Sequence, residues 1–161
     1  MLTSNGIDDN ATSTSMTLDA AGNVLVGTTS TGFSAEGHVF RAGDYVSHTV
    51  DNDVVALFNR TTSDGQLLQF RKDGVTVGSI GTKGGDAYIA STTQGIRMYD
   101  ANNTLLPTDA VGAGIDATIS LGQSGSSFKD LYLSGGVYLG GTGAANKLDD
   151  YEEGTWTPIL Q

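Results

Sequence analysis

The chain is 161 residues long, which suits one domain or a row of small modules. Eight basic against 18 acidic residues give a net charge of −10, and this charge argues against nucleic acid or an anionic membrane surface as a partner. Because the chain has no cysteine, disulfides and thiolate metal sites are excluded. No apolar run approaches the roughly 20 residues that span a bilayer, and the polar N-terminus shows no secretory signal pattern.

Short runs of apolar residues, each followed by turn residues, predict an all-β fold of short antiparallel hairpins and meanders. The clearest signal is a three-stranded meander formed by residues 54–60, 66–72 and 75–80. Its hairpin turns are predicted at residues 61–65, which end in Asp64-Gly65, and at Asp73-Gly74, where Asp-Gly between alternating segments favours a two-residue type I′ turn with positive φ at both positions. Additional strands are predicted at residues 23–28, 44–50, 86–90, 95–99, 117–121 and 137–139.

The predicted strands leave little room for a core that belongs to one chain alone. Apolar runs rarely exceed five residues, and alternation along residues 66–72 leaves apolar side chains on both faces. Such thin modules are usually completed by successive repeats or by other chains, which also cover exposed strand edges. Residues 127–132 fit either a helical turn or extended chain.

The acidic residues cluster at residues 8–9, 51–53 and 149–153. A glycosidase needs two carboxyl groups about 5 to 10 Å apart, whereas neighbouring residues of a strand point to opposite faces. We therefore interpret the clusters as solvated turns and connectors, and no calcium loop of the Asp-x-Asp-x-Asp-Gly type is present. The sequence also lacks a Gly-x-Ser-x-Gly elbow, and its Gly-x-Gly-x-x-Ala match at residues 112–117 is predicted to be a turn. These observations predict a protein that is not an enzyme and has no cofactor.

The C-terminal part of the chain carries a long motif. Residues 121–143 read LGQSGSSFKDLYLSGGVYLGGTG and are followed at residues 146–158 by NKLDDYEEGTWTP. This stretch resembles a module of tail-fibre and minor virion structural proteins of tailed phages. Two shorter segments, residues 18–28 and 70–80, are similar to elements of phage fibre shafts. The motif residues are Phe128, Lys129, Asp130, Leu131, Tyr132, Leu133, Gly135, Gly136, Leu148, Asp149, Asp150, Tyr151, Glu152, Glu153, Gly154, Thr155 and Trp156.

The resemblance implies an elongated, intertwined homotrimeric fibre of β-prism or β-helix type, located on the virion tail after assembly in the host cytoplasm. It implies a structural component of a phage tail fibre or appendage that positions or forms the host-attachment surface, with other tail or baseplate proteins as partners. One alternative is a glycan-binding, receptor-recognition module, motivated by the tyrosines and the polar loops. A fragment of a capsule depolymerase is the other, motivated only by the carboxylates. The family supplies no catalytic residue at these positions.

The same resemblance suggests a division of the chain into four parts. Residues 1–30 would be an N-terminal shaft or attachment segment, and residues 31–107 a β-meander module. Residues 108–145 would be a fibre module with the FKDLYLSGG motif, and residues 146–161 a linker to a C-terminal domain that is missing here. Trp156 is expected to pack against that domain rather than to form a sugar platform.

The two histidines of the chain, His38 and His48, lie ten residues apart. A metal site built by one chain would favour closer spacing or a third ligand. One histidine from each of three chains could bind a metal on a threefold axis, but the His-x-His pair that phage spikes use for this purpose is absent. The sequence therefore predicts ordinary strand or loop histidines and no metal site.

Overall fold

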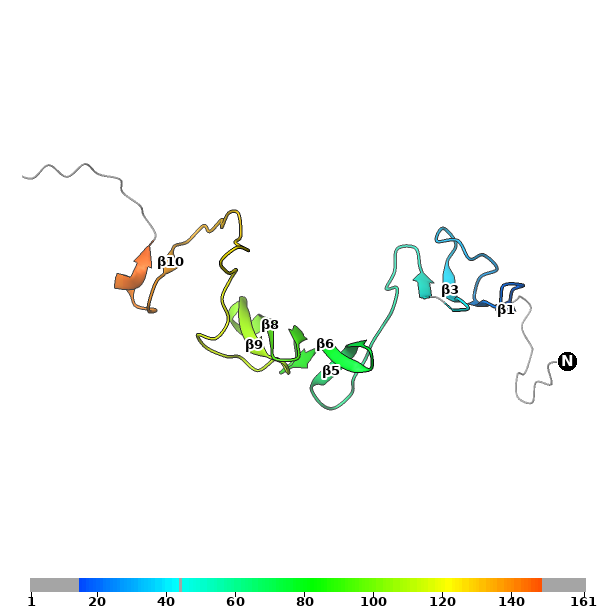
Figure 1. The fold of residues 1–161 in the computed structure, drawn as a ribbon, viewed down its shortest axis with the longest axis horizontal. Helices are drawn as coiled ribbons and strands as arrows, with labels where there is room; N and C mark the ends of the chain where they lie inside the picture. The colour runs from blue at the N-terminus through cyan, green and yellow to red at the C-terminus, as the bar shows by residue number, and fades with distance from the viewer. Residues whose placement is uncertain (1–14, 44, 149–161) are drawn as a thin grey trace, which may run out of the picture. The chain divides into compact units, whose positions relative to one another are not determined.

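The computed structural model describes residues 15–43 and 45–148 (Figure 1). Within these ranges the chain forms three antiparallel sheets and two short 3-10 helices, and it contains no α-helix. The all-β class and the antiparallel hairpins predicted from the sequence are confirmed. By its contacts the chain divides into two compact units, Met1–Gly114 and Ile115–Gln161.

The first sheet contains four strands in the order β1-β2-β3-β4. Their bounds are Met16–Leu18, Val24–Val26, Gly37–Phe40 and Val46–Thr49. The strands β2 and β4 lie within segments predicted to be extended, whereas β1 and β3 were missed because three or four residues are too few to reveal alternation. The boundary expected between residues 30 and 31 falls inside this sheet, since β2 pairs with β3 across it.

The turn between β1 and β2 is organised by the carboxylate of Asp19. Its Oδ1 accepts hydrogen bonds from the backbone N–H groups of Ala21 and Asn23, both at 2.9 Å, and its Oδ2 accepts one from the Asn23 side-chain amide at 2.7 Å. Gly22 completes the turn with a φ of +84°. The Asn23 side-chain hydrogen bond, followed by that of the Asn23 backbone, lowers the pKa of Asp19 below its usual value. Asp19, Gly22 and Asn23 thus have a local structural role in this turn.

The second sheet is a five-stranded meander in the order β5-β6-β7-β8-β9. The strands span Gly65–Lys72, Val75–Lys83, Asp86–Ser91, Gln94–Tyr99 and Thr104–Asp109, with a 3-10 turn at Asp100–Asn102 between the last two. Asp73 and Gly74 join β5 to β6 with φ values of 51° and 80°, the conformation that a type I′ turn requires. The strand β9 was missed because it contains Pro107, which is tolerated here because β9 lies at the edge of the sheet.

The strand predicted at residues 54–60 is not formed. This segment is irregular, and every residue from 51 to 64 is exposed to solvent. The apolar run gave the signal of a strand, but no other strand of the described chain pairs with it. Consequently Asp64-Gly65 is not a hairpin turn, because Gly65 begins β5 and the chain before it is not a strand.

Each of the two larger sheets buries one face. In the first sheet Leu25 and Val39, which pair directly, are 0% and 4% exposed. In the second sheet Tyr88 is fully buried, and its ring occupies the space above two glycines. A Cβ atom at Gly81 or Gly112 would come within 2.6 or 2.5 Å of Tyr88 side-chain atoms, so the ring needs both glycines.

The second unit is less regular. It contains a two-stranded sheet formed by β10, Val137–Tyr138, and β11, Lys147–Leu148. A 3-10 turn at Ala144–Asn146 lies in the connection directly before β11. No residue between 115 and 148 is buried. The strand predicted at residues 117–121 is absent, and residues 127–132 are irregular rather than helical. Neither segment pairs with a strand of the described chain.

Candidate functional site

The outward face of the second sheet is apolar and exposed. Directly paired residues of adjacent strands project from the same face, and the register aligns one apolar residue from each of the five strands. Three further apolar residues lie two positions along on the same face. We call this set the isoleucine face; it consists of Leu68, Phe70, Ile80, Ile89, Ile96, Met98, Leu105 and Pro107.

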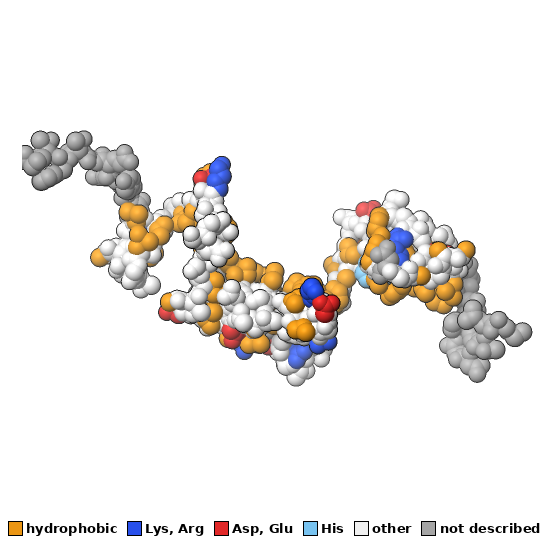
Figure 2. Space-filling model, in the orientation of Figure 1, with side chains coloured by type: hydrophobic (Ala, Val, Ile, Leu, Met, Phe, Trp, Pro, Cys, Tyr) orange, Lys and Arg blue, Asp and Glu red, His pale blue; other side chains and the backbone are white. Residues whose placement is uncertain are grey.

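The isoleucine face is large for a surface in contact with water. Phe70 and Ile89 are each 49% exposed, Ile96 is 44%, Met98 is 41% and Leu105 is 64% exposed. At the usual areas of such side chains this is on the order of 500 Å² of apolar surface, and monomeric proteins rarely leave a contiguous patch of more than a few hundred Å² uncovered unless it has a function. Hydrophobic side chains are visible at the surface of the part of the chain that holds this sheet (Figure 2).

The first sheet repeats the pattern on a smaller scale. Its register aligns Met16, Val26, His38 and His48 in one row, and Leu18, Val24, Phe40 and Val46 in the other row of the same face. We call these two rows the N-terminal face. Five of the six apolar side chains on it are between 37% and 56% exposed. The opposite face holds the buried pair described above, so both larger sheets have a buried face and an exposed apolar face.

The segment between the two sheets exposes a third set of apolar side chains. Val54, Val55, Leu57 and Phe58 are 67%, 45%, 79% and 55% exposed. Sequence reasoning placed this run in a strand, but in the structure it is irregular and exposed.

The motif that carries the family resemblance lies in the second unit, as far as it is described. Phe128, Leu131 and Leu133 are 65%, 63% and 56% exposed, and Tyr132 is 90% exposed. Lys129 and Asp130 form an ion pair of 3.5 Å at the surface, and Leu148 ends the short strand β11. The remaining motif residues, 149–156, lie outside the described residues. The described motif residues thus form an extended apolar surface, not a core.

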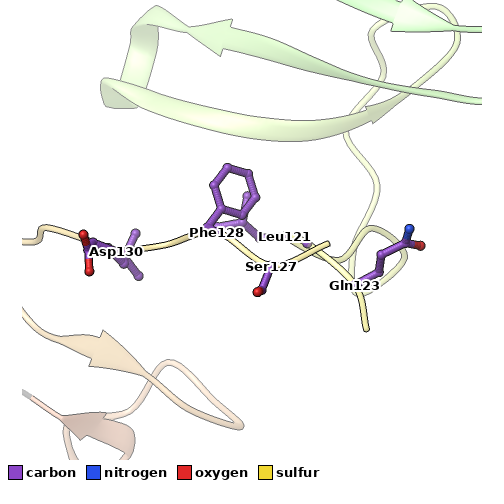
Figure 3. A pocket seen from close by; sticks show the side chains of 7 residues that line it. Leu121, Gln123, Ser127, Phe128 and Asp130 are labelled. Atoms are coloured by element: carbon purple, nitrogen blue, oxygen red, sulfur yellow. The ribbon is translucent and has the colours of Figure 1, made fainter. Parts of the chain in front are cut away.

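A shallow cavity of about 580 Å³ lies within this motif (Figure 3). Its lining consists of Leu121, Gly122, Gln123, Ser127, Phe128, Asp130 and Leu131. Reciprocal backbone hydrogen bonds of 3.0 and 3.1 Å between Gln123 and Ser126 close the turn at one end of it. The Leu121 and Phe128 side chains in its wall are 74% and 65% exposed, so the cavity is an open apolar groove. The polar side chains in its lining are those of Gln123, Ser127 and Asp130.

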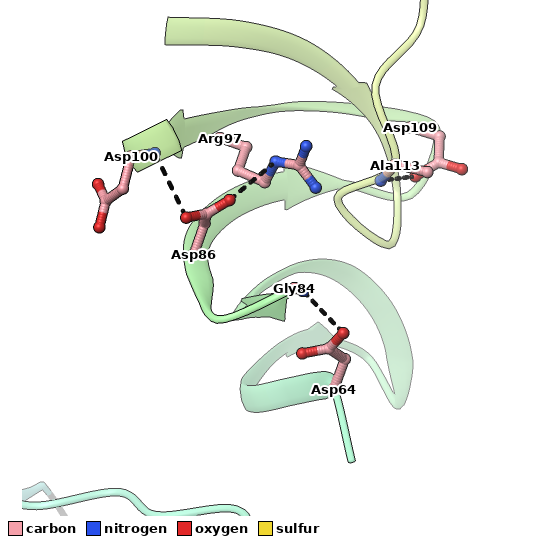
Figure 4. A network of polar contacts seen from close by, with 7 residues as sticks. All are labelled: Asp64, Gly84, Asp86, Arg97, Asp100, Asp109 and Ala113. Atoms are coloured by element: carbon pink, nitrogen blue, oxygen red, sulfur yellow. Dashed lines mark hydrogen bonds and ion pairs between the residues drawn. The ribbon is translucent and has the colours of Figure 1, made fainter. Parts of the chain in front are cut away.

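Three carboxylates in or beside the second sheet bind backbone N–H groups (Figure 4). Asp64 accepts a hydrogen bond from the N–H of Gly84 at 2.7 Å, and Asp109 accepts one from Ala113 at 2.9 Å. Asp86 accepts one from the N–H of Asp100 at 3.4 Å. It also lies 3.7 Å from Arg97 Nε in a largely buried ion pair on the face opposite the isoleucine face. Each of these carboxylates therefore has a structural partner.

The predicted acidic clusters are only partly within the described chain. Asp53 bonds the N–H of the next residue at 2.6 Å and is exposed, as is Asp51. The clusters at residues 8–9 and 149–153 lie outside the described residues. Among residues 15–43 and 45–148, no three His, Cys, Asp or Glu side chains gather as a metal site would require.

Two arrangements near the first sheet were missed by sequence reasoning. Phe33 and Tyr45 stack with centroids 6.2 Å apart and an interplanar angle of 10°, and the guanidinium of Arg41 lies 5.7 and 5.0 Å from their ring centres. The second arrangement brings His38 and His48 together, because the β3–β4 hairpin returns the chain on itself. The ten-residue spacing of the histidines could have signalled this pairing, since it suits two strands joined by a short turn.

No helix in the described part of the chain is both long and apolar enough to cross a membrane. Searches of protein-family models, of curated proteins and of solved structures found no match for the chain.

Proposed function

We propose that the chain is a structural segment of a homo-oligomeric appendage, and that the appendage is a phage tail fibre in which this segment positions or forms the host-attachment surface. The observation that carries the proposal is the isoleucine face. It crosses all five strands of a well-formed sheet and yet remains open to solvent. A surface of this kind is covered in most proteins by another layer of secondary structure or by another chain.

The free energies of burial and of association favour several contact surfaces per chain. Covering one half-exposed side chain of this size contributes about 1 to 2 kcal/mol, while association costs roughly 4 to 15 kcal/mol. The isoleucine face alone is also smaller than the roughly 800 Å² that each partner buries in a standard interface. The isoleucine face, the N-terminal face and the segment of residues 51–64 together exceed that area. An intertwined trimer, of β-prism or β-helix type, lets each chain use all three regions.

The second unit supports the same proposal. Residues 115–148 contain no buried residue, so their order within an assembly would come from contacts with neighbouring chains. Within them, the residues from Phe128 to Gly136 carry the resemblance to tail-fibre proteins. The carboxylates described above bind backbone amides, which supports a structural rather than a catalytic role.

The mass of the intact protein in solution tests the proposal. Multi-angle light scattering should give three chains per particle at micromolar concentration. A folded, soluble monomer with an intact second sheet would contradict the oligomer, because the isoleucine face would then be stable in water. Immunogold labelling of virions would test the location, with the tail as the expected site of labelling.

A second candidate function is glycan recognition at the ring pair of Phe33 and Tyr45. These rings are 65% and 45% exposed, and exposed aromatic rings can stack on the apolar faces of sugars. The adjacent Arg41 guanidinium would suit an acidic sugar. A glycan array probed with the intact protein and with Tyr45→Ala tests this candidate. Binding that is equal for the two proteins, or absent from both, would leave the structural role alone.

A further inference from the structure

The two histidines of the chain converge on the N-terminal face. His38 of β3 and His48 of β4 are directly paired in the register. Their Nδ1 atoms lie 2.6 Å apart, and their rings meet edge to face with centroids 4.8 Å apart. The chain has no other histidine and no cysteine, so its only imidazole ligands meet at this one point.

We propose that His38 and His48 form a bidentate site for a divalent transition metal, with Zn²⁺, Ni²⁺ or Cu²⁺ as the class of ion. Imidazole nitrogen is a preferred ligand of these ions, with metal–nitrogen distances of about 2.0 to 2.1 Å. Two nitrogens bound to one tetrahedral ion are then roughly 3.3 Å apart. The two Nδ1 atoms would have to move apart by less than about 1 Å to reach that geometry, which small rotations of the half-buried His38 ring and the exposed His48 ring can supply.

Binding of an ion changes the tautomer of one of the two histidines. In the present contact one ring donates its Nδ1–H to the Nδ1 lone pair of the other. A metal needs a lone pair on both Nδ1 atoms, so the donating ring transfers its proton to Nε2 when the ion binds. Both rings stay neutral, and no net proton is released from a neutral pair.

The other coordination positions are not filled by a third side chain of the described residues, since no group of three candidate ligands occurs there. Water can complete the coordination of one chain. A second copy that covers the N-terminal face would bring its own pair of histidines to the ion. The chelate itself requires only one chain, so the inference does not depend on the proposed function.

The choice of ion distinguishes binding at the two imidazoles from binding at the carboxylates of the chain. With a net charge of −10 the chain attracts any cation, but Ca²⁺ and Mg²⁺ prefer oxygen ligands. Zn²⁺ bound at the imidazoles should therefore persist in excess Mg²⁺.

Calorimetric titration of the untagged chain with Zn²⁺ in excess Mg²⁺ tests the inference. We expect saturable binding that weakens by at least about tenfold in His38→Ala and in His48→Ala, because each variant keeps only one of two linked ligands. The double variant Asp51→Asn/Asp53→Asn removes two nearby carboxylates and should bind Zn²⁺ as the parent does. Far-UV circular dichroism confirms that each variant keeps its sheets.

A spectroscopic measurement on the unaltered chain avoids any question of misfolding. Long-range ¹H–¹⁵N spectra of the imidazoles should show both Nδ1 signals moving with Zn²⁺, and both Nε2 atoms protonated. The inference is overturned if the imidazole nitrogens do not respond to Zn²⁺. It is equally overturned if either histidine variant binds as tightly as the parent, or if the Asp51→Asn/Asp53→Asn protein loses the binding instead.

Discussion

The second sheet and the segment of residues 115–148 use apolar side chains in opposite ways. In the sheet, cross-strand register collects alternate residues on a common face, and one face becomes a core around Tyr88. Residues 115–148 also contain leucines, a phenylalanine and tyrosines, but without long strands these side chains never collect. The difference teaches that a meander of short hairpins can form a core within one chain, whereas residues 115–148 bury no side chain of their own.

Removing the ring of Tyr88 tests most directly whether the second sheet has a core that residues 115–148 lack. Tyr88→Ala should destabilise the second sheet by about 3 to 5 kcal/mol, as is usual for a buried aromatic residue. Urea denaturation followed by circular dichroism measures the effect. Tyr132→Ala, at a position 90% exposed in the second unit, is the matched control and should change the stability of the sheet by less than about 0.5 kcal/mol. Equal effects of the two substitutions would remove the distinction.

Charging the isoleucine face separates folding from assembly. The double variant Ile89→Asp/Ile96→Asp should keep the sheet, because both side chains point away from Tyr88, but it should raise the dissociation constant of the oligomer at least about 100-fold. Sedimentation velocity across a dilution series measures this. Thr92→Asp adds a charge in the exposed β7–β8 turn and should leave assembly unchanged. A double variant that assembles normally would show that the face is not an interface.

A smaller effect is expected where the backbone approaches the Tyr88 ring. Gly112 has a φ of +81°, and a Cβ there would lie 2.5 Å from Tyr88 Cδ1. Gly112→Ala should therefore cost about 1 to 3 kcal/mol. Gly114→Ala meets no atom within 4 Å and is the control. Thermal unfolding should separate the two variants, and identical melting temperatures would contradict the packing described here.

The smallest effect concerns the Asp19 turn, which is local like the turns of the second unit. Because hydrogen bonds lower the pKa of Asp19, its contribution is fully present above the ordinary aspartate value near pH 4. The contribution is lost as the pH falls through the lowered folded-state value. The amide proton of Asn23 should titrate in NMR spectra at a pH below 4, and Asp19→Asn should abolish that titration. A midpoint at or above the ordinary value would contradict the turn geometry.

The all-β class and the hairpin turn at Asp73-Gly74 could be predicted from the sequence, whereas the hairpin turn predicted at Asp64-Gly65 is not formed. Asp73-Gly74 needs no tertiary context, because its backbone conformation depends on the two residues themselves. The run from Val54 to Phe58 is more continuously apolar than β6, but a strand also needs a partner strand, and a single segment does not show whether it has one. Similarly, Pro107 hides β9 because only the position at a sheet edge makes that residue acceptable.

The candidate site could be anticipated only in outline. Alternation indicated that the strand containing Leu68 has two partly apolar faces, but the isoleucine face requires the register of four strand pairs. The bulge between Gln66 and Leu68 shifts that register by one residue, and no local pattern announces it. The meeting of His38 and His48 likewise follows from hairpin register and not from their spacing alone.

The strand order of the second sheet has a consequence for how the protein forms. The first three connections, β5–β6, β6–β7 and β7–β8, contain two residues each, so every pairing closes a very short loop. Chains whose contacts join residues close in sequence are among the fastest to fold, and single hairpins form within about 1 to 10 μs. Each newly made chain can therefore form this sheet by itself. In the proposed oligomer, the slow and concentration-dependent step would be the encounter between chains, and until then the apolar faces are exposed to chaperones or to aggregation.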